Sequence, residues 1–296
     1  MKRPIEACYD NSQLSTFQKC PMAYYLQYIK RLRKIEIDDT NDQLNFGSYA
    51  HKFWEAHFGK SDATFPSIVE GYEEPDDLPQ YSLKALEFFC RTYHEKYSVP
   101  DKAFHFKEVE QVCSFDIDGF TFIVKSDGIF EQSSNLFGLE NKTTRSLSYN
   151  YFDKFFLSSQ ISAQCYNIWQ KYNRCSGILL NVGEIKKLKR KPSGDYDGVM
   201  PVEDGFVTCK FSRDYCNRNK SELDDWKENT ILWLNRIEDA KHYHQFPKST
   251  GLWGGTICAK CEYKELCKVS VGKKLDESIL DVLYEETDPY DYLKTK

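Results

Sequence analysis

Four of the eleven cysteines are divided between the two ends of the chain. Cys20 lies near the N-terminus, while Cys258, Cys261 and Cys267 form a C-x2-C-x5-C cluster close to the other end. Four thiolates are the number that holds an iron–sulfur cluster or a structural zinc ion. A site built from all four must join both ends of the chain around everything between them, so we expect a fold closed by long-range contacts.

Size and composition favour a folded protein with a sizeable core. The chain has 296 residues, of which 41% are hydrophobic and 15% aromatic, too many for a disordered protein. No apolar run approaches the roughly 20 residues that span a bilayer, and no apolar segment follows the start Met1-Lys-Arg-Pro4. Eleven cysteines without an export segment favour reduced thiols and metal ligation. We therefore predict an intracellular, cytoplasmic protein without a membrane partner.

The charge distribution argues against a protein that coats nucleic acid by electrostatics alone, because the net charge is −5. One strongly basic run, Lys186–Lys191, stands out. It can be a solvated loop between two strands, or a loop that contacts phosphate beside an acidic site. The sequence leaves both interpretations open.

Hydrophobic periodicity and turn residues predict an α/β fold with a central mixed sheet flanked by helices. Ser15 is the expected N-cap of a first helix that ends near Lys30, and Asp118-Gly119 is the expected turn of a hairpin. Residues 61–80 carry several prolines and acids and are predicted to form a surface loop. Further helices are expected at about 44–58, 81–97, 155–173 and 213–242, and strands at about 104–115, 120–125, 128–131, 136–142, 177–185 and 205–211.

Three charged residues in the predicted strands have a spacing that suits metal-dependent hydrolysis. Asp127 and Glu140 fall on neighbouring strands joined by one hairpin, so their carboxylates can converge on a cation such as Mg²⁺. Lys142 follows Glu140 by two residues, and strand alternation places both side chains on one face. An ammonium there can hold the attacking water or offset charge on a phosphate. The alternative is an exposed hairpin with ordinary charges.

Together with the cysteines, this pattern resembles the PD-(D/E)XK nuclease superfamily, in its RecB-like branch with an iron–sulfur cluster. That branch includes AddB-type nuclease domains and CRISPR-associated RecB-like exonucleases. The resemblance spans almost the whole chain and rests on five features in order: Leu14-Ser15-x4-Cys20-Pro21-x2-Tyr24-Tyr25, Gly47-x3-His51, Asp127-x12-Glu140-x-Lys142, Gln160, and Cys258-x2-Cys261-x5-Cys267.

The resemblance implies a restriction-endonuclease-like core within a single domain. Residues 46–245 would form the nuclease core, with residues 1–45 and 246–270 as an iron–sulfur clasp and 271–296 as a C-terminal tail. It also implies a [4Fe–4S] cluster on the four cysteines, favoured over zinc because only one short Cys-x2-Cys pair is present. The cluster would join the terminal segments and stabilise the fold. The other seven cysteines are expected mostly to fill core positions.

The same resemblance assigns roles to the candidate site residues. His51, Asp127 and Glu140 would bind Mg²⁺ or Mn²⁺, Lys142 would position water or stabilise the transition state, and Gln160 would support them. Relatives often carry tyrosine four residues after the glutamine, but this chain has Gln164 there. A further acid of the first core strand would be Glu110, with Glu108 as its rival.

The function implied is a metal-dependent exonuclease that cuts at DNA ends, in recombination or repair, phage DNA processing or CRISPR adaptation. Expected partners are DNA and a helicase, recombinase or CRISPR adaptation protein. The chain has no GxxxxGK[ST] motif, so unwinding by ATP would need such a partner. The alternatives are a non-catalytic DNA-binding scaffold that retains the fold, and a structural module held by zinc.

Overall fold

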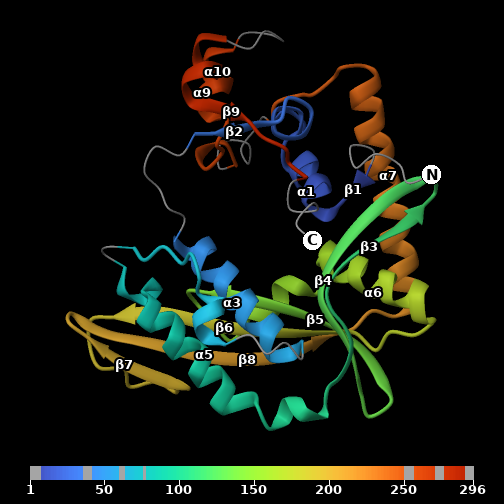
Figure 1. Ribbon diagram of the computed structural model, residues 1–296. Helices are drawn as coiled ribbons and strands as arrows, with labels where there is room; N and C mark the ends of the chain where they lie inside the picture. The colour runs from blue at the N-terminus through green and yellow to red at the C-terminus, as the bar shows by residue number, and fades with distance from the viewer. Residues whose placement is uncertain are drawn as a thin grey trace. The chain divides into compact units, whose positions relative to one another are not determined.

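A mixed β-sheet dominates the computed structural model, which describes residues 8–35, 42–59, 64–75, 78–249, 257–270 and 277–290 (Figure 1). The chain divides into two units. The sheet unit contains residues 39–113 and 125–223, and the cysteine unit contains residues 1–38, 114–124 and 224–296. Strand β3 (His105–Ile117), strand β4 (Phe120–Gln132) and helix α7 (Lys220–His242) begin in one unit and end in the other.

In the sheet unit, strands β4, β5, β6, β8 and β7 lie side by side in this order, and β3 pairs with β4. The β5–β6 pair is parallel, whereas the β4–β5, β6–β8 and β7–β8 pairs are antiparallel. The strands are β3 (His105–Ile117), β4 (Phe120–Gln132), β5 (Asn135–Thr144), β6 (Ile178–Leu188), β7 (Gly198–Val202) and β8 (Gly205–Cys216). The helices are α3 (Asp42–Phe58), α4 (Phe65–Ile68), η3 (Pro79–Tyr81), α5 (Leu83–Tyr97), η4 (Pro100–Ala103), η5 (Tyr151–Phe155) and α6 (Ser159–Tyr172).

Helices cover both faces of this sheet. On one face, Trp54 of α3 and Phe89 of α5 belong to a buried aromatic cluster, and Phe89 contacts Phe211 of β8 at a ring-centroid distance of 4.7 Å. On the other face, α6 lies so close to β5 that a Cβ on Gly138 would be 2.9 Å from the Ile168 side chain. The predicted α/β fold with a mixed sheet between helices is therefore confirmed.

The cysteine unit has its own smaller core, formed by Leu26, Tyr263, Leu266 and Tyr284. Its β1 pairs with the start of β4, and β2 pairs antiparallel with β9. The elements are β1 (Cys8–Tyr9), α1 (Asn11–Lys19), α2 (Pro21–Tyr24), η2 (Tyr25–Ile29), β2 (Leu32–Lys34), α7 (Lys220–His242), α9 (Lys264–Val269), α10 (Glu277–Leu283) and β9 (Tyr284–Glu286). Among the helices described, none is both long and apolar enough to cross a membrane.

The first predicted helix is broken in two, and Ser15 is not its N-cap. Helix α1 begins at Asn11, where the Asp10 side chain accepts a hydrogen bond from the Gln13 backbone N–H at 2.7 Å. Cys20 then has an extended backbone (φ −161°, ψ 108°) before α2 begins at Pro21. A residue before proline is disfavoured in the helical region because the proline ring would clash with it. The break thus places Cys20 between two helices.

Other predicted boundaries also moved. The helix expected at 155–173 begins as a 3-10 helix, η5, and α6 starts only at Ser159. Long-range pairing overrides local pattern around the basic run: β6 continues through Leu188, and the unpredicted β7 pairs with β8. Residues 213–216, expected in the last long helix, belong to β8. Part of the predicted loop at 61–80 lies outside the described residues, and its described part contains α4.

Candidate active site

Asp127 and Glu140 lie next to each other on β4 and β5. Gly128 pairs with Leu139 across these antiparallel strands, and Asp127 and Glu140 are the next residues in register. Both carboxylates are buried, with exposed fractions of 7% and 3%. The hairpin geometry expected from the sequence therefore brings these two acids together.

Asp127 lies close to two other acids, Glu110 and Glu140. Its Oδ2 accepts a hydrogen bond from the Asn141 backbone N–H at 2.6 Å and lies 3.7 Å from His51 Nδ1. Ligand atoms of His51, Glu110 and Asp127 all lie within 4.8 Å of one another. Burial, and then the charges of Glu140 and Glu110, raise the pKa of Asp127 well above its ordinary value. A bound divalent cation would remove this penalty.

Glu110 joins the site because β3 is locally distorted. Its φ of +49° is in the left-handed region, rare for a residue with a side chain. The buried carboxylate contacts Lys125 Nζ at 3.0 Å. Glu108, the rival, is instead bound by Lys171 and Tyr172 of α6. The structure thus brings Glu110, which the resemblance favoured over its rival Glu108, together with His51 and Asp127.

Glu140 is held by three cationic or amide donors. Lys142 Nζ contacts its Oε1, Gln160 Nε2 donates to Oε1 at 2.8 Å, and Gln164 Nε2 donates to Oε2 at 2.5 Å. Burial lowers the pKa of Lys142, but Glu140, Asp127 and, more weakly, Tyr151 offset this, so the pKa is raised and the ammonium stays charged. The lysine and both glutamines thereby orient one buried carboxylate.

Gln164 takes a larger part than the sequence indicated. Its side chain is fully buried, and its Nε2 also donates to the Lys125 backbone carbonyl at 3.2 Å. Asn167, one turn further, is 5% exposed. This side of α6 therefore faces the protein and not solvent, and Gln164 contacts the site carboxylate at the position where relatives often have tyrosine.

His51 reaches the site from α3, which packs closely against β5. A Cβ on Gly47, one turn before His51, would be 3.1 Å from the Thr143 hydroxyl, so glycine permits the close approach. Burial lowers the pKa of His51 despite the nearby Glu140 and Glu110. A neutral imidazole offers the lone pair that a metal needs. An open cavity of about 510 Å³ lies here, lined by His51, Glu110, Lys125 and Lys142 among others.

Behind Asp127, a buried hydrogen-bond network supports the strand that carries Asn141. The Asn141 side chain accepts from Asn181 Nδ2 at 2.7 Å, and Asn181 accepts from Arg213 Nε at 3.0 Å. Arg213 also donates to both carboxylate oxygens of Asp101, at 2.6 and 2.9 Å. Satisfied networks of this kind restrict the positions of their members. The network thus holds the side chain of Asn141, the residue whose backbone N–H contacts Asp127.

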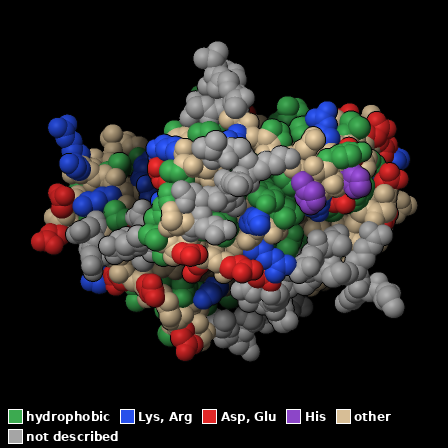
Figure 2. Space-filling model, turned by 90° about the horizontal axis from the view of Figure 1, so that it is seen from above, with side chains coloured by type: hydrophobic (Ala, Val, Ile, Leu, Met, Phe, Trp, Pro, Cys, Tyr) green, Lys and Arg blue, Asp and Glu red, His purple; other side chains and the backbone are tan. Residues whose placement is uncertain are grey.

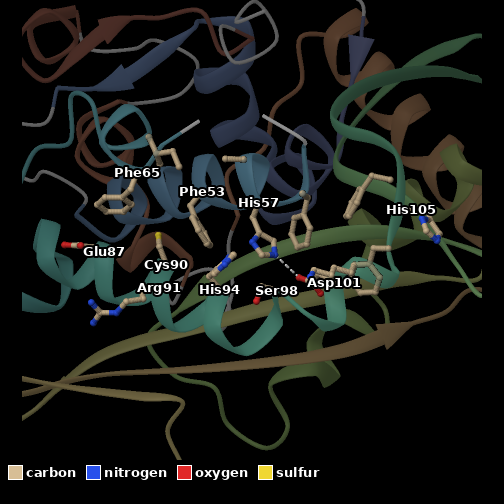
Figure 3. A pocket seen from close by; sticks show the side chains of 16 residues that line it. Phe53, His57, Phe65, Glu87, Cys90, Arg91, His94, Ser98, Asp101 and His105 are labelled. Atoms are coloured by element: carbon tan, nitrogen blue, oxygen red, sulfur yellow. Dashed lines mark hydrogen bonds and ion pairs between the residues drawn. The ribbon is translucent and has the colours of Figure 1, made fainter. Parts of the chain in front are cut away.

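The network ends at a second cavity of about 1040 Å³ in the sheet unit. Figure 3 shows His57 pointing toward Asp101, with which it makes a 3.0 Å contact, and His94 nearby. Five phenylalanines also line it: Phe53, Phe58, Phe65, Phe104 and Phe106. The buried acid of this cavity, Asp101, is already paired with His57 and Arg213.

The four cysteines predicted to form one site lie together in the cysteine unit. Cys20, Cys258, Cys261 and Cys267 all line a cavity of about 390 Å³. Burial first, and the neighbouring thiols of Cys20 and Cys258 after it, raise the pKa of Cys261. Cys20 Sγ accepts a hydrogen bond from the Ser249 backbone N–H at 3.4 Å.

The basic run belongs partly to the sheet. Lys186 contacts Glu184 at 2.7 Å and Lys187 contacts Asp204 at 3.5 Å, while residues 189–191 are exposed. On the face viewed in Figure 2, Lys and Arg side chains are interspersed with Asp and Glu. This mixture matches the net charge of −5 and does not form a broad basic surface on that face.

The chain matches a protein family model and is similar to solved structures. The family model described as the PD-(D/E)XK nuclease superfamily matches residues 11–268. The crystal structure of a "Putative exonuclease" from Eubacterium rectale is similar with a TM-score of 0.54 and 13% identity, over 94% of this chain and 93% of that chain. The structure of SSO0001 has a TM-score of 0.32 and 12% identity over 88% and 96% of the two chains, too distant to inform the fold. No curated protein matches significantly.

Proposed function

The chain belongs to the PD-(D/E)XK nuclease superfamily, and from this premise we propose that it is a metal-dependent deoxyribonuclease that cuts phosphodiester bonds at DNA ends. One observation carries the proposal. Asp127, Glu110 and Glu140 are buried acids on adjacent strands, with His51 beside them and Lys142 on the same face. Lys125 and Lys142 pair with Glu110 and Glu140, so the buried charge of Asp127 is the one in this group that a divalent cation would balance.

The donor set fits Mg²⁺ or Mn²⁺. Asp127 and Glu140 offer the carboxylate oxygens that both ions prefer, and the neutral imidazole of His51 suits Mn²⁺ better than Mg²⁺. Glu110 adds a further carboxylate within 4.8 Å of the Asp127 and His51 ligand atoms. A bound metal would polarise the phosphate and stabilise charge on the leaving oxygen.

The other residues of the site would act on the substrate and on Glu140. Lys142, a charged ammonium bound to Glu140 and partly exposed, can hold the attacking water or the phosphate oxygen. Gln160 and Gln164 would position Glu140 by their amide hydrogen bonds. We extend the preference for DNA ends from the resemblance to RecB-like exonucleases, and the exonuclease name given to the similar Eubacterium rectale protein agrees with it. A helicase, recombinase or CRISPR adaptation protein as partner stays a prediction.

We also propose a [4Fe–4S] cluster on Cys20, Cys258, Cys261 and Cys267. The four thiols line one cavity, which fits a group that needs four sulfur ligands. Structural zinc sites usually combine two short Cys pairs, whereas these four ligands contain only one, Cys258 and Cys261. This ligand spacing favours the cluster over zinc.

The nuclease proposal is tested with protein purified without oxygen and DNA labelled at one end, single-stranded or duplex, with Mg²⁺ or Mn²⁺. The wild type should degrade DNA, and Asp127→Asn should not. Asp214→Asn, an exposed acid on β8, is the matched control and should stay active. Binding without cleavage by every variant would favour the non-catalytic scaffold, unless added partner proteins restore cutting.

The cluster is tested by measuring iron, sulfide and zinc, together with the absorbance spectrum. Wild type should contain close to four irons and four sulfides per chain. Cys20→Ser should lose iron, whereas Cys113→Ser, a half-buried cysteine of β3, should retain it. One zinc and no iron in wild type would refute the proposal.

A further inference from the structure

The segment between β5 and α6 exposes three large apolar side chains beside the candidate active site. Tyr149 is 100% exposed, Leu157 is 90% exposed and Phe156 is 70% exposed. A fully exposed tyrosine buries no apolar surface in its own fold, so packing does not explain why an aromatic residue stands at position 149. Single exposed apolar residues are ordinary, but three of them lie within nine consecutive positions here. We call residues 149–157 the apolar segment.

This segment is firmly attached to the sheet unit. Before it, the Leu147 backbone N–H donates to Glu184 at 2.6 Å. Within it, the buried Phe155 accepts a hydrogen bond on its carbonyl from Arg218 Nη2 at 2.9 Å. The apolar side chains are therefore presented on an anchored backbone that includes the 3-10 helix η5.

The apolar segment is continuous with the candidate site at both ends. It follows β5, which carries Lys142, and precedes α6, which carries Gln160. Only two residues separate Leu157 from Gln160, whose Nε2 donates at 2.8 Å to Glu140, the acid that Lys142 contacts. A phosphate bound at Lys142 would therefore place the adjoining nucleotides within reach of this segment.

The chemistry of the segment matches an unpaired DNA strand. Exposed aromatic rings offer faces on which bases stack irrespective of sequence, and nearby cations bind the backbone. Lys154 supplies such a cation: it is exposed, and its Nζ lies 3.6 Å from the centroid of the Tyr151 ring. Bases in a duplex are already stacked and cannot use these faces without separation.

We propose that residues 149–157 form a stacking surface for unpaired bases next to the scissile phosphate, so that the protein prefers single-stranded DNA ends. This inference rests on the proposed nuclease function and specifies its substrate. Tyr149, Phe156 and Leu157 hold the bases, and Lys154 binds a flanking phosphate. The catalytic groups themselves are unchanged by this role.

The test compares wild type with the triple variant Tyr149→Ser, Phe156→Ser and Leu157→Ser. Since these side chains are exposed, the thermal unfolding temperature should stay the same. The kcat/KM for a single-stranded oligonucleotide should fall about tenfold or more, and that for a blunt duplex should fall less. Hydrolysis of bis(p-nitrophenyl) phosphate, which has no bases, should change less than about twofold. Val99→Ser, a 72% exposed residue of the same unit, is the matched control.

A binding measurement separates this inference from the nuclease proposal. An oligonucleotide with 2-aminopurine at its end should change fluorescence on binding the metal-free wild type, and the triple variant should lose that change. If wild type cuts nothing but shows the fluorescence change and the variant loses it, the nuclease proposal fails and the stacking surface stands. If the variant retains wild-type kcat/KM and fluorescence, the stacking surface is refuted. Concentration-dependent self-association that the variant abolishes, with unaltered DNA binding, would also refute it.

Discussion

Replacing Asp127 by asparagine should stabilise the metal-free protein while abolishing activity. The Asp127 carboxylate is buried beside Glu110 and Glu140, and its pKa is raised by burial and by those charges. Asparagine has nearly the same shape and can still accept the hydrogen bond from the Asn141 backbone N–H. The substitution therefore removes repulsion without opening a cavity.

The size of the effect follows from the geometry. Ligand atoms of Asp127 and Glu110 lie within 4.8 Å. Two unit charges at about that separation repel by roughly 3.5 kcal/mol at an effective dielectric constant of about 20. Lys125 and Lys142, each paired with a neighbouring glutamate, offset part of this repulsion. We expect a net gain of about 1–3 kcal/mol in the free energy of unfolding, which corresponds to an unfolding temperature higher by roughly 2–8 °C.

The assay is thermal and urea unfolding at pH 8 in a chelator, followed by titration of Mn²⁺. Mn²⁺ should raise the unfolding temperature of wild type and have little effect on Asp127→Asn. Asp101→Asn is the matched control, because Asp101 is as buried as Asp127 but is paired with Arg213 and His57. The Asp101→Asn variant should lose about 3 kcal/mol or more of its free energy of unfolding. If Asp127→Asn is less stable than wild type without metal, repulsion between Asp127 and the neighbouring acids does not destabilise the protein, and the reasoning is wrong.

Three further predictions concern the supports of the site. Burial raises the pKa of Asp101, but His57 and Arg213 outweigh it and lower the pKa, so its stabilising effect should be present above about pH 5 and be lost progressively as the pH falls below about 4 and through the lowered pKa; a difference in the free energy of unfolding between wild type and Asp101→Asn that does not shrink as the pH falls below about 4 would contradict this. Lys142→Met should reduce kcat by about 100-fold or more while the Mn²⁺ affinity measured by calorimetry stays within a few fold, and equal losses in both would mean that the lysine serves metal binding. Gly47→Ala should weaken Mn²⁺ binding, because its Cβ would push α3 and His51 away from the Thr143 hydroxyl; Lys84→Ala, on the exposed side of α5, is the control.

Local sequence was sufficient for the elements whose residues interact within a few positions. Periodicity located α3 and α5 to within about two residues, and the Asp118-Gly119 pair marked a turn in which both residues have positive φ. Strand alternation was enough to put Glu140 and Lys142 on one face. These predictions depend only on the geometry of a single helix or hairpin.

The other parts of the site depended on contacts between distant segments. Nothing near Glu108 or Glu110 in the sequence says which one turns inward, because the left-handed backbone of β3 at Glu110 decides it. The burial of Gln164 against Glu140 likewise follows from how α6 packs on β5. The alternation of side chains along a strand shows which residues share a face of the sheet. Which helix packs on that face depends on contacts between segments that are far apart in the sequence.

The sequence by itself determined the chemical repertoire: a histidine, paired acids, a lysine and four thiols in a recognisable order. The tertiary structure decided which of these groups come into contact and which carboxylate charges are balanced by a neighbouring cation. Burial and distance set the electrostatic energy of a carboxylate, and neither is a property of the residue alone. That is why Asp127 became the centre of the site only in the folded chain.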